Sequence, residues 1–142
     1  MPVEPPPLQI ENLSFRYRSR TETAIRNISL TIQPGQVVMI AGASGCGKTT
    51  LARCINGLIP RSYKGEMTGS ILLQGQDISK FSLSRISQVV GTVLQDPERQ
   101  ILGTRVLFEV AFGLENLGLS RPEILQRVDE ALARLKISHL RD

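Results

Sequence analysis

The sequence predicts an α/β fold built around one strand, one glycine-rich loop and one helix. An apolar run at residues 37–41, VVMIA, is typical of a buried strand. The next nine residues, GASGCGKTT, contain the eight-residue phosphate-binding pattern GxxxxGK[ST]. Residues 51–56 favour a helix that Gly57 would end, so the strand, loop and helix follow one another in the order the pattern requires.

The residue types in this loop predict an anion site. Glycines let backbone N–H groups turn inward, and the helix N-terminus adds a positive end. Lys48 is expected to reach the β- and γ-phosphates of a nucleotide, and the Thr49 hydroxyl to bind Mg²⁺. The alternative, a glycine-rich turn that fits by chance, is disfavoured by the flanking strand and helix. The expected nucleotide-binding residues are Gly42, Ala43, Ser44, Gly45, Cys46, Gly47, Lys48, Thr49 and Thr50.

Two strands are predicted before the loop. Residues 1–7 form a proline-rich, extended leader without a signal-peptide pattern. Residues 8–17 alternate like a strand that ends in the aromatic Tyr17, and residues 24–32 alternate in the same way. Pro34 and Gly35 then turn the chain into the strand before the loop. A hairpin-like start is therefore expected.

Further elements are predicted after the loop. Residues 58–69 are a connection rich in glycine and proline, residues 70–74 a short strand, residues 75–77 a turn, and residues 82–87 one helical turn. Residues 89–94 form another apolar run that predicts a buried strand, and Gln95 follows it directly. Ligands gather at the carboxyl ends of strands in open α/β sheets, which makes Gln95 a candidate site residue.

Two helices are predicted at the end of the sequence. Residues 105–116 place apolar side chains at helical spacing, and Gly118 follows as a stop signal. Ser120 and Glu123 have the spacing of a capping box that would open the next helix. The apolar stripe of that helix consists of Ile124, Val128, Ala131, Leu132 and Leu135. Both stripes are expected to be mainly core.

With the loop, Tyr17 and Gln95 in place, the chain resembles the ATP-binding subunit of an ABC (ATP-binding cassette) transporter. LSFRY at residues 13–17 looks like the family's A-loop region, whose aromatic stacks on adenine; the alternative is a packed core aromatic. VLQDPE at residues 93–98 looks like its Q-loop, whose glutamine approaches Mg²⁺; the alternative is an ordinary polar loop residue. The resemblance thus adds Tyr17 and Gln95 to the nucleotide site, Gln95 with Thr49 as a Mg²⁺ ligand, and ATP and Mg²⁺ as cofactors.

The resemblance also implies partners and a division of the chain. We expect residues 8–96 to be a β subdomain with the P-loop core and residues 97–142 to begin a helical subdomain. A membrane-embedded subunit would dock near Glu98, Arg99, Gln100 and Arg105, and a second ATP-binding subunit would complete the site. The implied location is the cytoplasmic face of the cell membrane, with the protein attached peripherally.

The sequence departs from this family in what it lacks. The LSGGQ-type signature, the Asp-Glu pair that ends a strand, the D-loop and the switch histidine do not occur in residues 1–142. The only histidine, His139, is expected to be a surface residue. We therefore expect the N-terminal part of a truncated ATP-binding domain that has no catalytic residue and does not hydrolyse ATP by itself.

Within the family, GLIP at residues 57–60, QDPERQI at 95–101 and VAFGLEN at 110–116 look most like the energy-coupling-factor group. That group imports vitamins and transition-metal ions such as cobalt or nickel. Two alternatives stay open. One is a soluble P-loop ATPase without a membrane partner, and the other is a non-catalytic remnant that binds nucleotide weakly or only assembles with other chains.

The composition excludes several other classes. At 41% hydrophobic and 21% charged residues it is ordinary for a globular protein, and a net charge of +4 does not argue for nucleic acid. No apolar run approaches the 18 residues of a membrane span, and no Cys/His spacing suggests zinc. Cys46 and Cys54 would lie about 12 Å apart, too far for a disulfide, and are predicted to be free thiols of a reducing cytosol. Alkylation of Cys46 would block the site, unless this cysteine is only a small, tolerated loop residue.

Overall fold

The computed structural model describes residues 4–142 and divides into two compact units, Met1–Thr92 and Val93–Asp142. The first unit holds the sheet and the P-loop, and the second is helical. Each unit is described by itself.

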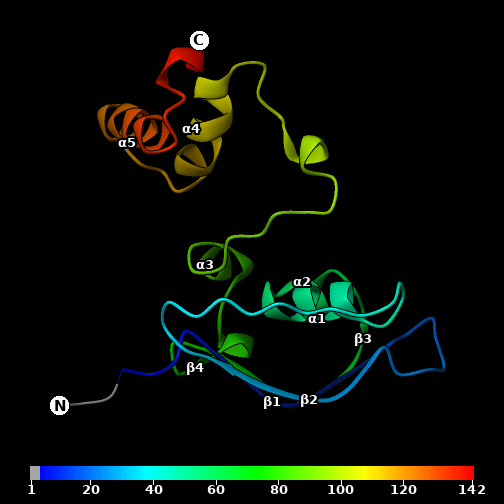
Figure 1. Cartoon of the computed structure of the whole chain (residues 1–142). Coiled ribbons are helices and arrows are strands. Elements are labelled where there is room, and N and C mark those ends of the chain that lie inside the picture. The colour runs from blue at the N-terminus through cyan, green and yellow to red at the C-terminus, as the bar shows by residue number, and fades with distance from the viewer. Residues whose placement is uncertain (1–3) are drawn as a thin grey trace. The chain divides into compact units, whose positions relative to one another are not determined.

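The first unit contains a four-stranded antiparallel sheet of order β2-β1-β3-β4 (Figure 1). Its strands are β1 (Leu8–Tyr17), β2 (Ile25–Ile32), β3 (Gly65–Leu73) and β4 (Gln76–Asp77). The alternation in β1 buries Ile10, Leu13 and Phe15 on one face. The predicted antiparallel start of the chain is therefore confirmed.

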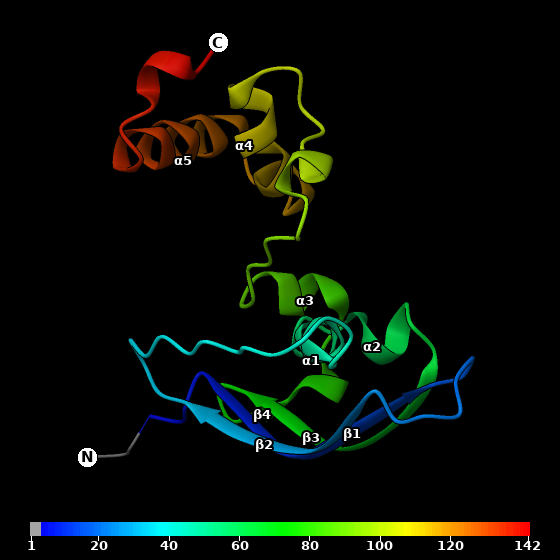
Figure 2. The same ribbon diagram turned by 45° about the vertical axis from the view of Figure 1, so that its right-hand side comes forward.

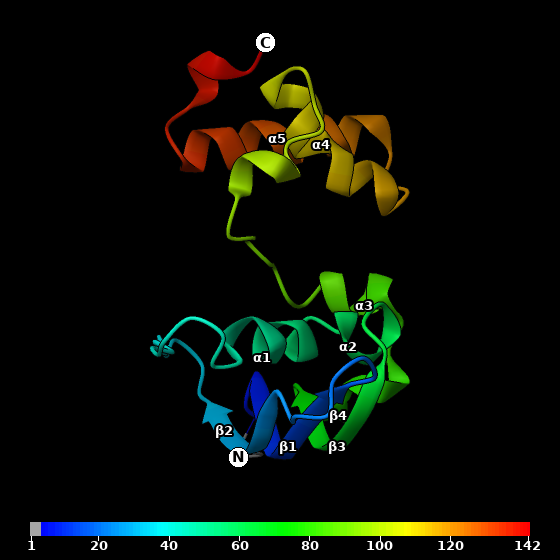
Figure 3. The ribbon, with the colours of Figure 1, turned by 90° about the vertical axis from the view of Figure 1, so that its right-hand side faces the viewer.

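Two helices, α1 (Lys48–Ile55) and α2 (Leu58–Arg61), lie over one face of this sheet (Figures 2 and 3). Gly57 separates them with a φ of 76°, and its N–H donates to the Cys54 carbonyl at 3.2 Å, as expected of a glycine that ends a helix. The helix α3 (Leu83–Ser87) follows, where one helical turn was predicted, and Ser82 caps it by accepting from the Arg85 N–H at 3.1 Å. The core between sheet and helices is made by Leu8, Ile10, Leu13, Phe15, Ile25, Leu51, Cys54, Ile59, Ile71, Leu73, Ile78 and Ile86.

Two predicted strands are wrong. Residues 37–41 and 89–94 are not strands, and their side chains are largely in water: Val37 is 94% exposed, Met39 88% and Val93 82%. A strand needs a neighbour that accepts its backbone hydrogen bonds, and within residues 4–142 no strand pairs with either segment. The predicted burial of these two segments is therefore wrong as well for the residues that the structure describes.

Three boundaries also differ from the prediction. The strand predicted at residues 70–74 begins at Gly65, because β3 pairs with β1 as far as Tyr17. The turn predicted at residues 75–77 contains the short strand β4, and the connection at 58–69 contains α2. In each case pairing or packing against the sheet orders residues whose local sequence signals a loop.

The second unit is built from α4 (Val106–Asn116) and α5 (Arg121–Arg134), with 3₁₀ turns at Pro97–Gln100 and Ser138–Leu140. Its core consists of Ala111, Ile124, Val128 and Leu132, so the predicted stripes do pack as a core. Gly118, with a φ of 71°, ends the predicted helix as expected. The capping box is not formed: Ser120 precedes α5, but its side chain makes no capping hydrogen bond.

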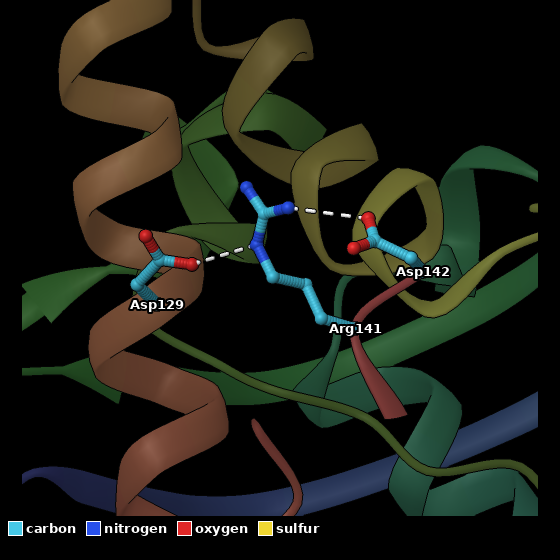
Figure 4. Close-up of polar contacts among 3 residues, drawn as sticks. All are labelled: Asp129, Arg141 and Asp142. Carbon is cyan, nitrogen blue, oxygen red and sulfur yellow. Dashed lines mark hydrogen bonds and ion pairs between the residues drawn. The ribbon is translucent and has the colours of Figure 1, made fainter. Parts of the chain in front are cut away.

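The end of the second unit is held by Arg141 (Figure 4). Its guanidinium contacts Asp129 of α5 at 2.9 Å and Asp142 at 3.2 Å, and its carbonyl accepts the Leu107 N–H at 2.9 Å. The hydrogen bond to Asp129 raises the pKa of the Arg141 guanidinium. The predicted division of the chain at residues 96 and 97 stays a prediction.

Candidate functional site: the phosphate-binding loop

The loop between residues 42 and 47 curls tightly before α1. Gly45 and Gly47 adopt left-handed backbone, with φ of 82° and 99°. A Cβ atom on Gly47 would lie 2.6 Å from the Ala24 carbonyl oxygen, so only glycine permits this approach to the start of β2. At Gly45 a Cβ would meet nothing within 4 Å, which leaves this part of the loop open to a ligand.

Lys48 lies across the loop at the first residue of α1. Its Nζ donates to the Gly42 and Ala43 carbonyls, both at 2.8 Å, and lies 3.6 Å from the Cys46 Sγ. Lys48 as a whole is only half-buried. A positive charge is thus held at the centre of the loop, where the sequence predicted the phosphates.

The two threonines after Lys48 have different environments. Thr49 is exposed, and its hydroxyl is available to a ligand. Thr50 is only 7% exposed, and its Oγ1 lies 3.1 Å from the Tyr17 Oη. The hydroxyl of Thr50 is therefore engaged inside the unit, so its predicted contact with nucleotide would come from its backbone.

Tyr17 ends β1 beside this helix turn. Its ring packs edge-on against Phe15, with centroids 4.8 Å apart and planes at 81°, and it is half-buried. The structure therefore brings Tyr17 and the first turn of α1 together, which the sequence could suggest only through resemblance. Adenine stacking on the ring face stays a prediction, and the hydroxyl has a structural partner that sequence reasoning missed.

Gln95 belongs to the second unit and is exposed. In the segment that follows it, the Gln100 Oε1 accepts the Leu94 N–H at 2.9 Å. Of the predicted docking residues, Arg99 pairs with Asp96 at 3.7 Å, and Arg105 lies 6.0 Å from the Phe108 ring centroid. The role of Gln95 at Mg²⁺ stays a prediction.

The two cysteines are free, as expected, and lie in opposite environments. Cys46 is exposed on the loop, whereas Cys54 is buried in the core. Burial raises the pKa of the Cys54 thiol to about 12, because the thiolate would be desolvated. Only Cys46 is therefore placed to react.

Two further features lay outside the sequence predictions. A pocket of about 540 Å³ opens where β1 ends and β3 begins, and it includes no predicted site residue; it is lined by Arg16, Arg18, Pro60, Lys64, Gly65 and Glu66. Glu109 accepts hydrogen bonds from two backbone N–H groups, and its only sequence signal is an acidic residue in the first turn of a helix.

Among residues 4–142 no group of three His, Cys, Asp or Glu side chains could hold a metal ion, and no described helix is long and apolar enough to cross a membrane.

Comparison with known proteins shows the family of the chain. The family model described as ABC transporter matches residues 25–142. The chain belongs to the ABC transporter family. ABC transporter ATP-binding proteins of Lactiplantibacillus plantarum and Treponema denticola are 46% and 42% identical over 135 residues; these cover 95% of this chain and 24% and 28% of the relatives. The chain therefore spans about a quarter of the length of these curated relatives.

A solved structure agrees with this assignment. The structure of cbiO1 from Clostridium perfringens, described as part of the ABC transporter complex cbiONQ, matches 98% of this chain and 54% of its own with a TM-score of 0.80 and 36% identity. The α/β fold of an ABC ATPase, with an antiparallel sheet followed by helices, is thus confirmed, and the chain is a partial ABC domain. The loop geometry suits ATP and Mg²⁺, because the open backbone at Gly45, the Lys48 ammonium and the exposed Thr49 hydroxyl lie at one helix N-terminus.

Proposed function

We propose that this ABC protein binds ATP with Mg²⁺ at the loop between residues 42 and 50 and supplies the ATP-binding part of an importer. One observation carries the proposal: the Lys48 Nζ is held by two loop carbonyls, one residue from an exposed Thr49 hydroxyl. A cation and a hydroxyl at a helix N-terminus are what a magnesium-bound triphosphate requires.

Each residue has a distinct part in this proposal. Loop N–H groups and Lys48 bind and orient the phosphates, because charge-assisted hydrogen bonds are stronger than neutral ones. Thr49, with Gln95 as an expected second ligand, would hold Mg²⁺, which neutralises phosphate charge when bound. Tyr17 offers its ring face to the adenine while its hydroxyl stays on Thr50. No residue of this chain is assigned the activation of water.

The proposed partners are a membrane-embedded subunit and a second ATP-binding subunit. The relative cbiO1 is described as part of a transporter complex, which supports a membrane partner. The segment after Gln95 offers exposed charges for that contact, at Arg99 and Arg105 among others. The protein would then sit at the cytoplasmic face of the membrane, and vitamins or transition-metal ions are the proposed cargo.

Co-expression with a candidate membrane subunit tests the assembly. Charge reversal at Arg99 or Arg105 is expected to reduce co-purification of that subunit and to leave nucleotide binding intact, because neither residue belongs to the loop. Arg121→Glu on the same unit is the matched control, since Arg121 is exposed and lies outside this segment. If the unmodified protein binds ATP and retains no membrane subunit, a soluble ATPase is favoured. If it also fails to bind ATP, the chain is a non-catalytic remnant.

A further inference from the structure

The pocket of about 540 Å³ in the first unit lies where β1 ends and β3 begins. Its volume is within the range of small-molecule sites, about 300–1,000 Å³. Backbone pairing fixes both strands at this point, because Tyr17 is opposite Gly65 and the Arg18 N–H donates to the Lys64 carbonyl at 3.1 Å. The walls of the pocket are therefore held in place by the sheet.

Gly65 lets the two strands approach closely beside the pocket. A Cβ atom at this position would overlap the Arg16 carbonyl oxygen and would lie 2.5 Å from the Phe15 Cζ. With no side chain at Gly65, the strand backbone itself lines the pocket, and Pro60 of α2 adds an apolar surface. No lining residue belongs to the phosphate-binding loop, so the pocket is a separate place on the first unit.

The charged side chains around the pocket leave an excess of positive charge. Arg16, Arg18 and Lys64 supply three cations, and Glu66 supplies one carboxylate. That carboxylate is already paired, because the Glu66 Oε2 lies 2.7 Å from the Arg16 Nη2. The side chains of Arg18 and Lys64 make no hydrogen bond or ion pair within the part of the chain that the structure describes. Two positive charges are therefore left without a partner.

Two unpaired cations beside one cavity favour an anionic ligand. Like charges repel one another, and a bound anion replaces this repulsion by attraction. Arginine offers a planar fork of donors and lysine a point charge, and both are regular ligands of phosphate. A phosphate group carries up to two negative charges at neutral pH, which matches two cations, whereas a carboxylate would match only one.

We propose that this pocket binds a phosphate group, with Arg18 and Lys64 as the cations that neutralise it and Arg16 as a further donor. Arg16 retains N–H groups for this purpose, because a guanidinium has five and the structure commits one to Glu66 and one to the Arg20 carbonyl at 3.4 Å. Since Arg18 and Lys64 are exposed, binding should weaken as salt is added. Phosphate binding at this pocket does not require the proposed function.

Titration of inorganic pyrophosphate into the isotope-labelled full chain, followed by amide NMR, tests each site separately. The amide signals of Arg18 and Gly65 are expected to shift, and to shift equally in Lys48→Ala, which lacks the cation of the phosphate-binding loop. The signals of Gly45 and Gly47 report on that loop. Acetate, a monoanion, at matched ionic strength should shift the signals of Arg18 and Gly65 much less.

Substitution of the two unpaired cations tests their part in binding. Arg18→Gln and Lys64→Gln should each weaken pyrophosphate binding about three- to tenfold, and the double variant should weaken it by more than about tenfold. Arg26→Gln and Lys80→Gln are the matched controls, because they make the same charge changes at exposed positions outside the pocket. Both controls should bind pyrophosphate as the unsubstituted protein does, and the amide spectrum shows whether each variant is folded.

The phosphate group can belong to a free small molecule or to a lipid headgroup, and a second experiment distinguishes them. The protein is sedimented with vesicles of phosphatidylcholine and phosphatidic acid, with phosphatidylcholine alone as the blank. Pyrophosphate binding without retention on the phosphatidic acid vesicles supports a soluble ligand. Retention that pyrophosphate competes away and that the double variant loses supports a headgroup.

Three results would overturn the proposal. One is that neither pyrophosphate nor the phosphatidic acid vesicles bind, and another is that the double variant binds as tightly as the two controls. The third is that the shifts of Arg18 and Gly65 vanish in Lys48→Ala, which would place the anion in the phosphate-binding loop. Missing shifts of Gly45 and Gly47 would instead count against the proposed ATP site and leave the result for the pocket unaffected.

Discussion

The Tyr17 side chain has two expected roles, a hydrogen bond made by its hydroxyl and adenine stacking on its ring, and substitutions can separate them. Tyr17→Phe removes the Oη that lies 3.1 Å from the Thr50 Oγ1 and keeps the ring that packs on Phe15. A neutral hydrogen bond contributes about 0.5–1.5 kcal/mol, and a buried hydroxyl left without its partner adds to the loss. We therefore expect Tyr17→Phe to lower the free energy of unfolding by about 1 kcal/mol while ATP binding persists.

Tyr17→Ala removes the ring as well. The half-buried ring and its edge-on contact are worth about 2–4 kcal/mol, so this variant should be clearly less stable and should bind ATP weakly. Chemical denaturation of the full chain and titration with a fluorescent ATP analogue give the two numbers. A double-mutant cycle with Thr50→Val isolates the hydroxyl contact, for which about 1 kcal/mol of coupling is expected.

Tyr63→Phe is the matched control, because Tyr63 packs against Arg53 and its hydroxyl makes no contact within residues 4–142. It should change stability by less than about 0.5 kcal/mol. The account of the hydroxyl is refuted if Tyr17→Phe is as stable as Tyr63→Phe and the cycle shows no coupling. Adenine stacking is refuted if Tyr17→Ala binds ATP like the unsubstituted protein, and equal loss in both variants would make the hydroxyl the binding group.

Three further predictions concern thiols, acid and turnover. An alkylating reagent should label Cys46 in the folded protein and Cys54 only after unfolding, and bound ATP should slow labelling of Cys46; mass spectrometry of the labelled peptides decides this. Hydrogen bonds from Ser79 lower the pKa of Asp77 in the folded protein. The stability that these bonds supply is therefore present above the ordinary Asp77 pKa of 3.8 and is lost as the pH falls through the lower pKa of the folded state. Asp77→Asn should accordingly make stability depend less on pH in this acidic range. Residues 1–142 alone should release no phosphate from ATP above a Lys48→Ala blank, and steady turnover that the blank lacks would contradict this.

The sequence predicted those parts of the fold whose signals are local. The alternating strands β1 and β2, the helices after Lys48 and Arg105, and the stops at Gly57 and Gly118 all follow from patterns within a few residues, and all were found. The strand predictions for residues 37–41 and 89–94 were wrong for a non-local reason. A buried strand requires hydrogen-bonding neighbours, and residues 4–142 supply none to these two segments.

The candidate site was likewise predictable only where its sequence signal is local. The loop pattern identified Lys48 and Thr49, because phosphate chemistry constrains residue types at fixed spacing. It could not predict that the Thr50 hydroxyl is engaged by Tyr17, which is 33 residues away. It also could not single out Glu109, since an acidic residue in the first turn of a helix is common and only the fold brings the Leu102 and Gly103 N–H groups to it.

The central claim is that the loop binds ATP through Lys48, and titration of a fluorescent ATP analogue into Lys48→Ala tests it most directly. Loss of one charge-assisted phosphate contact is worth about 1.5–3 kcal/mol, so the affinity should fall by about ten- to a hundredfold. Lys80→Ala, which makes the same charge change at an exposed site outside the loop, should bind as the unsubstituted protein does. Equal affinity in both variants, with circular dichroism showing both folded, would contradict the account.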